Sequence, residues 1–384
     1  MSVIRHLRTV LIYSGVVLLV LFAALALQYI ICPVYDFPEP RPFSGDHWYN
    51  PYQTLHGNWY KANFHAHSRA WLGVTDGMDE SRDVYRHYEK IGYDVIGLSN
   101  YQSIQALRKG NHHFFPVYEH GYNIGKRHHL AIGAKRVIWS DYPFWQSRHH
   151  KQHLLKVLRR TTPCLVIAHP MLMKAFSEED FAGLTDYDAV EVLNHFVNSA
   201  RLWDAALSAG RLVWIVGDDD THNISDPGQT GVCWTMVNAL SARQDDIIAA
   251  LKAGHMYGVQ GRGGSMDNGL RYVRIRNDSL LVEVERSARE ILFIHDEGKI
   301  LSTFSDTDRA GVPLTLRESY VRIEIQNEKS TMYLNPVLRF DGAHLPSSSA
   351  TTDVAMTWFR RLAAIGLLTA FSLVLLTIRQ RKHP

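Results

Sequence analysis

The chain has 384 residues, of which 46% are hydrophobic and 21% are charged. This composition is typical of a folded protein with a sizeable core and excludes a disordered or low-complexity chain. The formal net charge of +3 at pH 7 is too small to indicate a nucleic-acid partner. The three cysteines form no CxxC pair, so the sequence supports neither a disulfide framework nor a thiolate zinc site.

A long apolar segment lies close to the N-terminus. Residues 10–31 carry no formal charge and are long enough to span the roughly 30 Å hydrocarbon core of a bilayer. Arg5 and Arg8 lie in the preceding segment, residues 1–9, as in a signal peptide, but the apolar run is too long for one and lacks a small-x-small cleavage site. We therefore expect an uncleaved transmembrane helix over residues 10–31.

A second apolar segment, residues 362–378, lies near the C-terminus. It is shorter, but Trp358 and Phe359 before it suit a membrane interface. Basic residues in the tail, 379–384, and before the first segment predict that both termini are cytoplasmic, because positive charge is retained on that side. The sequence thus predicts an integral protein of the bacterial inner-membrane type with an extracytoplasmic, periplasmic soluble part. The alternative is that residues 362–378 form a core helix.

The region between the two apolar segments divides into three parts. Residues 32–58 are rich in Pro and aromatic residues without a helical or strand period, which is typical of an extended linker. In residues 59–264 short apolar runs alternate with helical stretches, which predicts an α/β fold with a parallel sheet or a (β/α) barrel. In residues 265–345 short alternating strands predict a small antiparallel β-sandwich. The clearest helical stretches are 79–91, 151–160, 200–210 and 244–254.

Side chains that bind metals or transfer protons gather where the predicted strands of residues 59–264 end, which is where an α/β barrel collects its active site. The candidates are His65 and His67 in NFHAH, Asp76 in TDG, Glu119 in VYEHG, His128 and His129 before LAIG, His169 in LVIAHP, and Asp220 and His222 in GDDDTH. A single HxH pair means little in a chain with 21 histidines, but chance does not explain why such motifs close successive apolar strands.

The types of these residues indicate the chemistry. His65 and His67 alternate at the period of a strand, so both imidazoles point to one side and can chelate one ion. Imidazoles combined with bridging carboxylates suit Zn, Mn or Fe, whereas Mg and Ca prefer mostly oxygen ligands. The sequence therefore predicts a centre with divalent Zn, Mn or Fe.

Taken in order, the motifs over about residues 60–261 resemble the PHP (polymerase and histidinol phosphatase) superfamily. The resemblance implies a distorted (β/α)7 barrel, extended here by the small C-terminal β-sandwich and flanked by two transmembrane helices. It also implies one metal held by His65, His67, Glu119 and Asp220. A second metal would be held by Glu119, His128 and His169, with His129 as the alternative to His128.

The chain departs from the family pattern after the second strand. Where the family has Thr-Asp-His-Asn, this chain has Ser99, Asn100, Tyr101 and Gln102. A third metal would use Asp76, the missing histidine and His222, so Tyr101 in place of an imidazole weakens or abolishes that site. The resemblance therefore implies two divalent ions.

Glu191 and Asn194 in AVEVLNH match a family position near the site, where orientation of the metal ligands is their expected role.

Two neighbouring cations predict a hydrolase that uses a metal-bound hydroxide, with phosphoester cleavage as the family's usual chemistry. We expect His222, Asp220 and Glu191 to take part in catalysis, with His222 protonating the leaving group of a small anionic ester. The alternative is a catalytically degenerate domain that serves as a membrane-anchored binding or scaffold module. A third possibility, a proofreading exonuclease, is disfavoured because an extracytoplasmic domain meets no DNA. The sequence does not identify protein partners.

Overall fold

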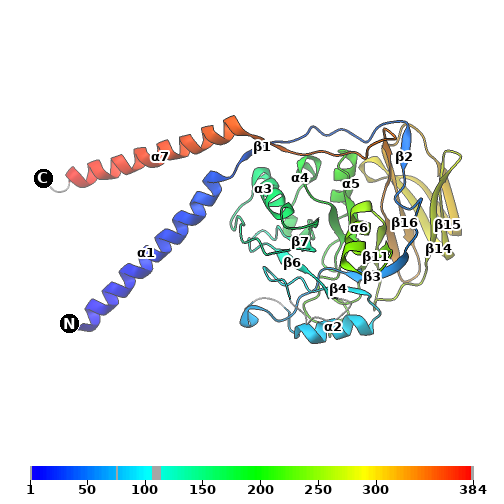
Figure 1. Cartoon of the computed structure of the whole chain (residues 1–384), viewed down its shortest axis with the longest axis horizontal. Helices are drawn as coiled ribbons and strands as arrows, with labels where there is room; N and C mark the ends of the chain where they lie inside the picture. Colours follow the sequence, from blue (N-terminus) through cyan, green and yellow to red (C-terminus); the bar gives the residue numbers. More distant parts are fainter. Residues whose placement is uncertain (1, 75–76, 106–113, 382–384) are drawn as a thin grey trace.

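The computed structural model describes residues 2–74, 77–105 and 114–381 and shows a mixed α/β protein (Figure 1). Two long helices extend from one side of the folded domain, and the other elements lie within that domain. The helices are α1 (Ser2–Ile31), α2 (Ser81–Lys90), α3 (Arg148–Arg159), α4 (Glu178–Gly183), α5 (Ala200–Ser208), α6 (Gln244–Ala253) and α7 (Val354–Arg381), with the short 3-10 turns η1 (Trp71–Gly73), η2 (Leu172–Lys174) and η3 (Asp296–Gly298).

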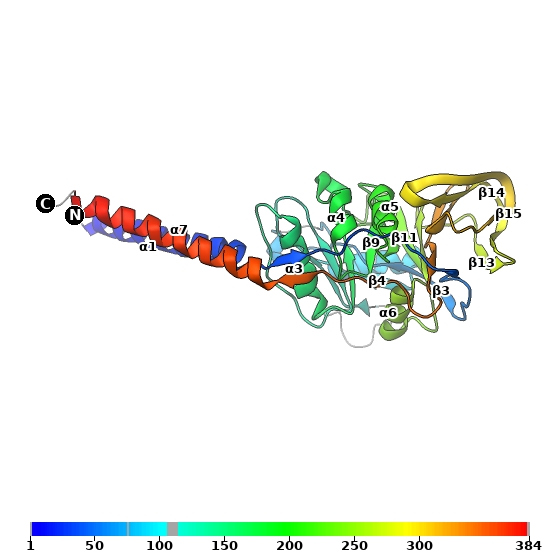
Figure 2. The same ribbon diagram turned by 90° about the horizontal axis from the view of Figure 1, so that it is seen from above.

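The long helices α1 and α7 contain the two apolar segments. The stretches His6–Ile31 and Val354–Val374 are long and apolar enough to cross a bilayer, by length and composition alone. The second helix begins at Val354, earlier in the chain than the apolar segment itself. Both helices leave the domain beside a short antiparallel pair, β1 (Val34–Asp36) and β19 (Thr351–Asp353), so they emerge together (Figures 1 and 2).

The segment after α1 packs along the domain. The amide of Tyr35 donates to Nδ1 of His149 at 3.1 Å. The buried hydroxyl of Tyr52 donates to the carbonyl of Met256 at 2.8 Å and accepts from the amide of Asn335 at 2.6 Å. These contacts attach residues 32–58 to the folded part at both ends.

One sheet has five strands in the order β10-β9-β8-β7-β6. Strands β8, β9 and β10 run parallel, whereas β7 is antiparallel to both of its neighbours. All residues of these strands are buried, as expected for strands covered on both faces. The strands are β6 (Val117–His120), β7 (His129–Ile132), β8 (Cys164–Ile167), β9 (Ala189–Leu193) and β10 (Trp214–Gly217).

The other large sheet has twelve strands, whose main path is β13-β14-β16-β17-β12-β11-β3-β4-β5. Its pairs β3–β4 and β4–β5 are parallel, and the remaining pairs are antiparallel. The strands are β2 (His47–Tyr49), β3 (Asn58–Asn63), β4 (Val95–Gly97), β5 (Phe114–Phe115), β11 (Cys233–Ala239), β12 (Met256–Gln260), β13 (Leu270–Arg276), β14 (Ser279–His295), β15 (Lys299–Pro313), β16 (Tyr320–Gln326), β17 (Thr331–Leu334) and β18 (Val337–Phe340).

A closed (β/α)7 barrel is not confirmed, because the two large sheets do not join into one among the described residues. Isolated bridges between Ala66 and Thr221 and between Tyr101 and Glu119 connect them instead. Among their bonds, the amide of Glu119 donates to the carbonyl of Ser99, and the amide of Asp220 donates to the carbonyl of His65, both at 2.8 Å. The α/β part of the prediction is confirmed, and these bridges lie at the strand ends where the candidate ligands are found.

The C-terminal strands form an antiparallel array, as expected, but not as a separate pair of sheets. Strand β17 pairs with β12, so the array continues the twelve-stranded sheet. The long β14–β15 hairpin lies at the end of the molecule opposite the two projecting helices (Figure 2).

All four predicted helical stretches overlap a helix, namely α2, α3, α5 and α6, although α3 begins earlier than predicted, at Arg148. Helix α4 was not predicted, because its 6 residues are too few to show a helical period of apolar residues.

Candidate metal centre

Two segments from distant parts of the chain form the base of the site. His65 and His67 lie directly after β3, and Asp220 lies shortly after β10. The amide of Asp220 donates to the carbonyl of His65, and the amide of His67 donates to the carbonyl of Thr221, both at 2.8 Å. The backbone therefore holds the HxH pair against the carboxylate, as the strand-end argument predicts.

The hairpin of β6 and β7 forms the opposite wall. Glu119 lies within β6, and His128 directly precedes β7. His169 follows β8, and the amide of Ala168 donates to the carbonyl of His128 at 3.1 Å. The side chains of Glu119, His128 and His169 are all buried and lie together.

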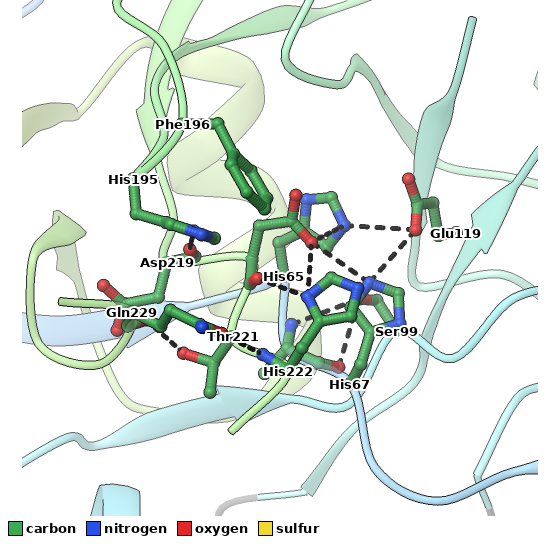
Figure 3. Close-up of polar contacts among 12 residues, drawn as sticks. His65, His67, Ser99, Glu119, His195, Phe196, Asp219, Thr221, His222 and Gln229 are labelled. Atoms are coloured by element: carbon green, nitrogen blue, oxygen red, sulfur yellow. Dashed lines mark hydrogen bonds and ion pairs between the residues drawn. The ribbon is translucent and has the colours of Figure 1, made fainter. Parts of the chain in front are cut away.

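The first group of potential ligands is His65, His67, Glu119 and Asp220 (Figure 3). Nε2 of His65 lies 3.3 Å from Oε2 of Glu119 and 3.1 Å from Oδ1 of Asp220. Nε2 of His67 lies 3.1 Å and 3.2 Å from the same two oxygens. Ligand atoms about 2.1 Å from one tetrahedral ion lie about 3.4 Å apart, so this spacing suits a shared ion.

The second group is Glu119, His128 and His169. Nδ1 of His128 lies 2.5 Å from Oε1 of Glu119, and Nε2 of His169 lies 3.1 Å from the same oxygen. Glu119 therefore directs Oε2 to the first group and Oε1 to the second. One carboxylate thus contributes an oxygen to each of the two groups.

Unsatisfied polar atoms test whether the cluster fits a metal. Buried polar atoms in proteins normally have hydrogen-bond partners. Within the described ranges, partners are lacking for Nε2 of His65 and His67, Nδ1 of His128, Oε2 of Glu119 and Oδ1 of Asp220. These atoms face one another, and cations between them would satisfy all five. The cluster therefore fits divalent metal ions.

The pKa shifts within the cluster also favour bound cations. Burial lowers the pKa of His65, but Asp220, Glu191 and Glu119 together raise it well above its ordinary value. Burial also lowers the pKa of His67, but Asp220 and Glu119 outweigh this effect and raise the pKa to about 9. The imidazoles hold the pKa of Glu119 well below its ordinary value against the effect of burial. The buried carboxylates thus attract positive charge, which bound cations can supply in place of protons.

Glu191 lies behind the cluster rather than in it. Its Oε1 is 2.9 Å from Nδ1 of His65, and its Oε2 accepts the amide of His169 at 2.6 Å. His65 and His169 could also hold an ion together with Glu191. Because both oxygens of Glu191 already have these partners, orienting His65 so that Nε2 faces the cluster is the role that the geometry favours.

The structure brings His128, and not His129, to the cluster. Asn194 also lies close, since its Nδ2 donates to Oδ2 of Asp220 at 3.3 Å. Asp76 lies outside the described residues. The predicted contribution of Asp76 to a third metal site therefore stays a prediction.

His222 and Tyr101 lie at the outer edge of the cluster. The His222 ring stacks on His67 at 4.4 Å between centroids, and its side chain is 29% exposed. Its Nδ1 lies 2.9 Å from the carbonyl of Asp220. The Tyr101 ring lies 5.0 Å from His67 and 5.2 Å from His128. A phenol thus occupies the position beside the cluster where the family pattern has an imidazole.

Two residues of the cluster adopt backbone conformations that are unusual for residues with a side chain. His169 has φ of 27° and Asp220 has φ of 52°. Such strained conformations are retained mainly at functional sites, where the surrounding structure enforces them. Here the bonds to Glu191 and to the His65 carbonyl hold the two residues in place.

Three neighbours of the site did not stand out in the sequence. Asp219 accepts the amides of Gly231, Val232 and Cys233 at 2.7–2.8 Å and so fixes the loop after Asp220. The run of three aspartates was a signal that could have indicated this role. The amine of Lys126 lies 5.6 Å from the centre of the Tyr101 ring. Phe196 lies across the site from Glu119 (Figure 3), with its ring 6.4 Å from that of His222.

Comparisons with known proteins name no family. No protein-family model matches the chain, and no curated protein matches it. One similar solved structure is a two-domain protein from Bacteroides vulgatus, described as containing a predicted PHP-like metal-dependent phosphoesterase. It is 12% identical, with a TM-score of 0.41, and the match covers 78% of this chain and 100% of that one. A likeness of this size carries no argument about the activity of the present chain.

Proposed function

We propose that this protein is a metal-dependent hydrolase with a binuclear centre that cleaves a small anionic ester of the phosphoester class. The observation that carries the proposal is the position of Glu119. Its two carboxylate oxygens reach two separate groups of imidazoles, both fully buried. Family membership in the PHP superfamily is part of the same proposal, and it rests on the motifs that supply these ligands.

Two divalent ions, when bound, activate water and neutralise charge that develops on the ester oxygens. His65, His67, Glu119 and Asp220 would hold one ion. His128 and His169 would hold the other, with Glu119 shared between them. Tyr101 weakens the third site, so two ions are expected.

Residues at the outer edge would handle the substrate. Lys126 lies over the Tyr101 ring and is placed to attract an anionic ester toward the cluster. His222, stacked on His67 and partly exposed, would protonate the leaving group. Removal of the imidazole in His222→Ala should then slow esters with poor leaving groups far more than p-nitrophenyl esters. Unchanged turnover at constant metal content would exclude this role.

The placement of the domain is also proposed. The helices α1 and α7 would both cross the inner membrane, so that the centre faces the extracytoplasmic, periplasmic side. The apolar composition of the two helices and the basic residues near both ends of the chain support this arrangement.

The full-length protein in detergent, stripped with a chelator and reloaded separately with Mn, Zn or Fe, provides the test. We expect about two metal ions per chain and metal-dependent hydrolysis of phosphomonoesters or phosphodiesters, with slower cleavage of carboxyl esters. Glu119→Gln should lower the metal content to at most about one ion per chain, because the bridging charge is lost. The exposed Glu297 provides the matched control, and Glu297→Gln should change neither quantity.

The competing function is a scaffold domain that has lost catalysis. The replacement of the family's Asp-His pair by Asn100 and Tyr101 favours it. The two functions differ in metal content. Less than one metal ion per chain after reloading, together with no hydrolysis, would support the scaffold.

A further inference from the structure

Exposed apolar side chains are concentrated between the base of α1 and the metal cluster. Six of them form what we call the aromatic ridge: Trp71, Tyr122, Ile124, Trp139, Phe144 and Trp145. Ile124 is 70% exposed and Trp145 is 61% exposed. Large exposed apolar patches on soluble domains commonly mark interaction sites. Trp and Tyr are also the residues enriched where proteins meet the membrane interface.

One end of the ridge contacts the first long helix. The ring of Tyr29, near the C-terminal end of α1, lies 4.4 Å from the ring of Trp145. The Tyr29 hydroxyl accepts the amide of Phe144 at 2.9 Å. If α1 crosses the bilayer, this end of the ridge lies at the membrane surface.

The middle of the ridge is continuous in the structure. The amide of Ile124 donates to the carbonyl of Pro143 at 2.9 Å, next to Phe144. The hydroxyl of Tyr122 donates to the carbonyl of Trp139 at 2.9 Å. The loop before β7 and the loop after it are therefore held side by side.

The other end of the ridge reaches the metal cluster. The Trp71 ring meets that of Trp139 edge to face, with 5.8 Å between centroids. The indole nitrogen of Trp71 donates to the carbonyl of Tyr101 at 2.8 Å. Tyr101 in turn contacts the rings of His67 and His128. Apolar surface thus runs from the helix base to the edge of the site.

The loops that carry most of the ridge contain more basic than acidic residues. Residues 120–147 contain four basic residues, Lys126, Arg127, Lys135 and Arg136, and one acidic residue, Asp141. Asp141 is buried and accepts the amides of Tyr122 and Tyr142. A surface that combines basic and aromatic residues suits an anionic lipid headgroup with its chains still in the bilayer.

The arrangement of the elements also places the hairpin of the metal cluster toward the bases of the two long helices. Figures 1 and 2 show α3 at the end of the domain from which α1 and α7 emerge, with β14 and β15 at the opposite end, and Figure 1 shows β6 and β7 beside α3. The hairpin that carries Glu119 and His128 is therefore nearer to the helix bases than the β14–β15 hairpin is.

From these contacts we propose that the substrate is a lipid phosphoester, which stays anchored in the bilayer while the aromatic ridge guides its headgroup to the metal cluster. This inference rests on the proposed function, because it names the substrate class of the same site. In the reaction the oxygen of water forms a bond to phosphorus, and the bond from phosphorus to the lipid oxygen breaks. One proton of the water ends on the lipid hydroxyl and the other stays on the released phosphate.

The test compares two esters with the same headgroup. Full-length, metal-loaded protein in mixed micelles is assayed with phosphatidic acid and with glycerol 3-phosphate. We expect kcat/KM for the lipid to exceed that for the soluble ester by at least about 100-fold, since lipid and protein share one micelle and the effective concentration of the headgroup at the site is raised. Ile124→Asp should lower the ratio of the two values at least about tenfold.

A matched control uses the same change on an exposed isoleucine elsewhere. Ile300, 59% exposed in β15, lies in the hairpin opposite the helices, so Ile300→Asp should leave the ratio unchanged. Equal rates for the two esters, or equal effects of the two substitutions, would overturn the lipid inference and leave the hydrolase intact. Failure of the metal-loaded wild type to hydrolyse either ester would instead overturn this inference together with the phosphoesterase.

Discussion

Both faces of the β6–β7 hairpin carry buried histidines, but the surroundings of these histidines differ. Strand register pairs His120 with His129 on one face, while Glu119 and His128 lie on the other. All four side chains are buried. On the cluster face the imidazole of His128 contacts a carboxylate, whereas on the other face His129 lies beside the rings of His120 and Phe176.

The difference shows that burial does not by itself produce a metal ligand. Burial, followed by the neighbouring imidazoles, lowers the pKa of His129 well below its ordinary value, so this ring stays neutral. Burial also lowers the pKa of His128, but there the adjacent Glu119 carboxylate opposes the effect of burial. At His67 the carboxylates of Asp220 and Glu119 outweigh burial and raise the pKa to about 9. A buried carboxylate within contact distance, rather than a raised pKa, is therefore what separates a candidate ligand from a packed histidine.

Substitution of His128 and of His129, one at a time, should give the clearest test of the difference between the two faces. His128→Gln should lower the metal content from about two ions to about one and reduce phosphoester turnover on the order of 1,000-fold, because about 4 kcal/mol of charge stabilisation is lost. His129→Gln should keep both ions and most of the activity. Metal analysis of the two purified variants, with turnover measured in parallel, checks this. Loss of metal in His129→Gln but not in His128→Gln would reverse the assignment.

Most of the candidate ligands could be read from the sequence because they lie within or near the end of a short apolar strand. The period of a strand placed His65 and His67 on one side, and the strand ends brought Asp220 and Glu119 to the same edge. The choice between His128 and His129 could not be made in this way. It depends on the register of β6 and β7, which is fixed by the hairpin loop and by packing rather than by local pattern.

Features that depend on loops or on sheet edges were outside the reach of the sequence. Lys126 reaches Tyr101 from a backbone with φ of 52°, a conformation that no local pattern announces. The antiparallel pairing of β7 with both neighbours could not be read from the sequence either, because strand pairing is a tertiary property. The aromatic ridge joins loops from separate parts of the chain, so the sequence alone does not show that its residues lie together.

The three consecutive aspartates allow a similar comparison within one loop. Asp219 accepts three backbone amides, and the Tyr88 hydroxyl donates to it at 2.9 Å. Asp219→Asn places an amide group among these donors and should lower the free energy of unfolding by about 3 kcal/mol. Asp220→Asn should instead remove a metal ligand and cost stability mainly in the metal-loaded protein.

Thermal unfolding with and without chelator separates the two variants. The deficit of Asp219→Asn should persist in chelator, whereas that of Asp220→Asn should shrink there. If both variants lost the same stability in both conditions, Asp220 would be a structural residue like its neighbour.

A substitution of Lys126, at the edge of the site, tests whether this residue contributes to substrate binding rather than to metal binding. Lys126→Met should raise KM for a phosphoester about tenfold and leave kcat within about twofold, because attraction of the anion is lost while the cluster is untouched. Lys299→Met, at an exposed position in the β14–β15 hairpin, is the control and should change neither constant. A fall in kcat with KM unchanged would assign Lys126 to the chemical step.

The smallest expected effect concerns the face of the hairpin away from the cluster. Both ring nitrogens of His129 are buried and lack a hydrogen-bond partner in the part of the chain that the structure describes. His129→Leu replaces this polar ring by an apolar side chain, so the free energy of unfolding should rise by about 1 kcal/mol. Denaturant unfolding of the metal-free protein measures the change, and metal content should stay at the wild-type value. A loss of more than about 1 kcal/mol would show that His129 has a polar role in the core, and the contrast between the two faces would then fail.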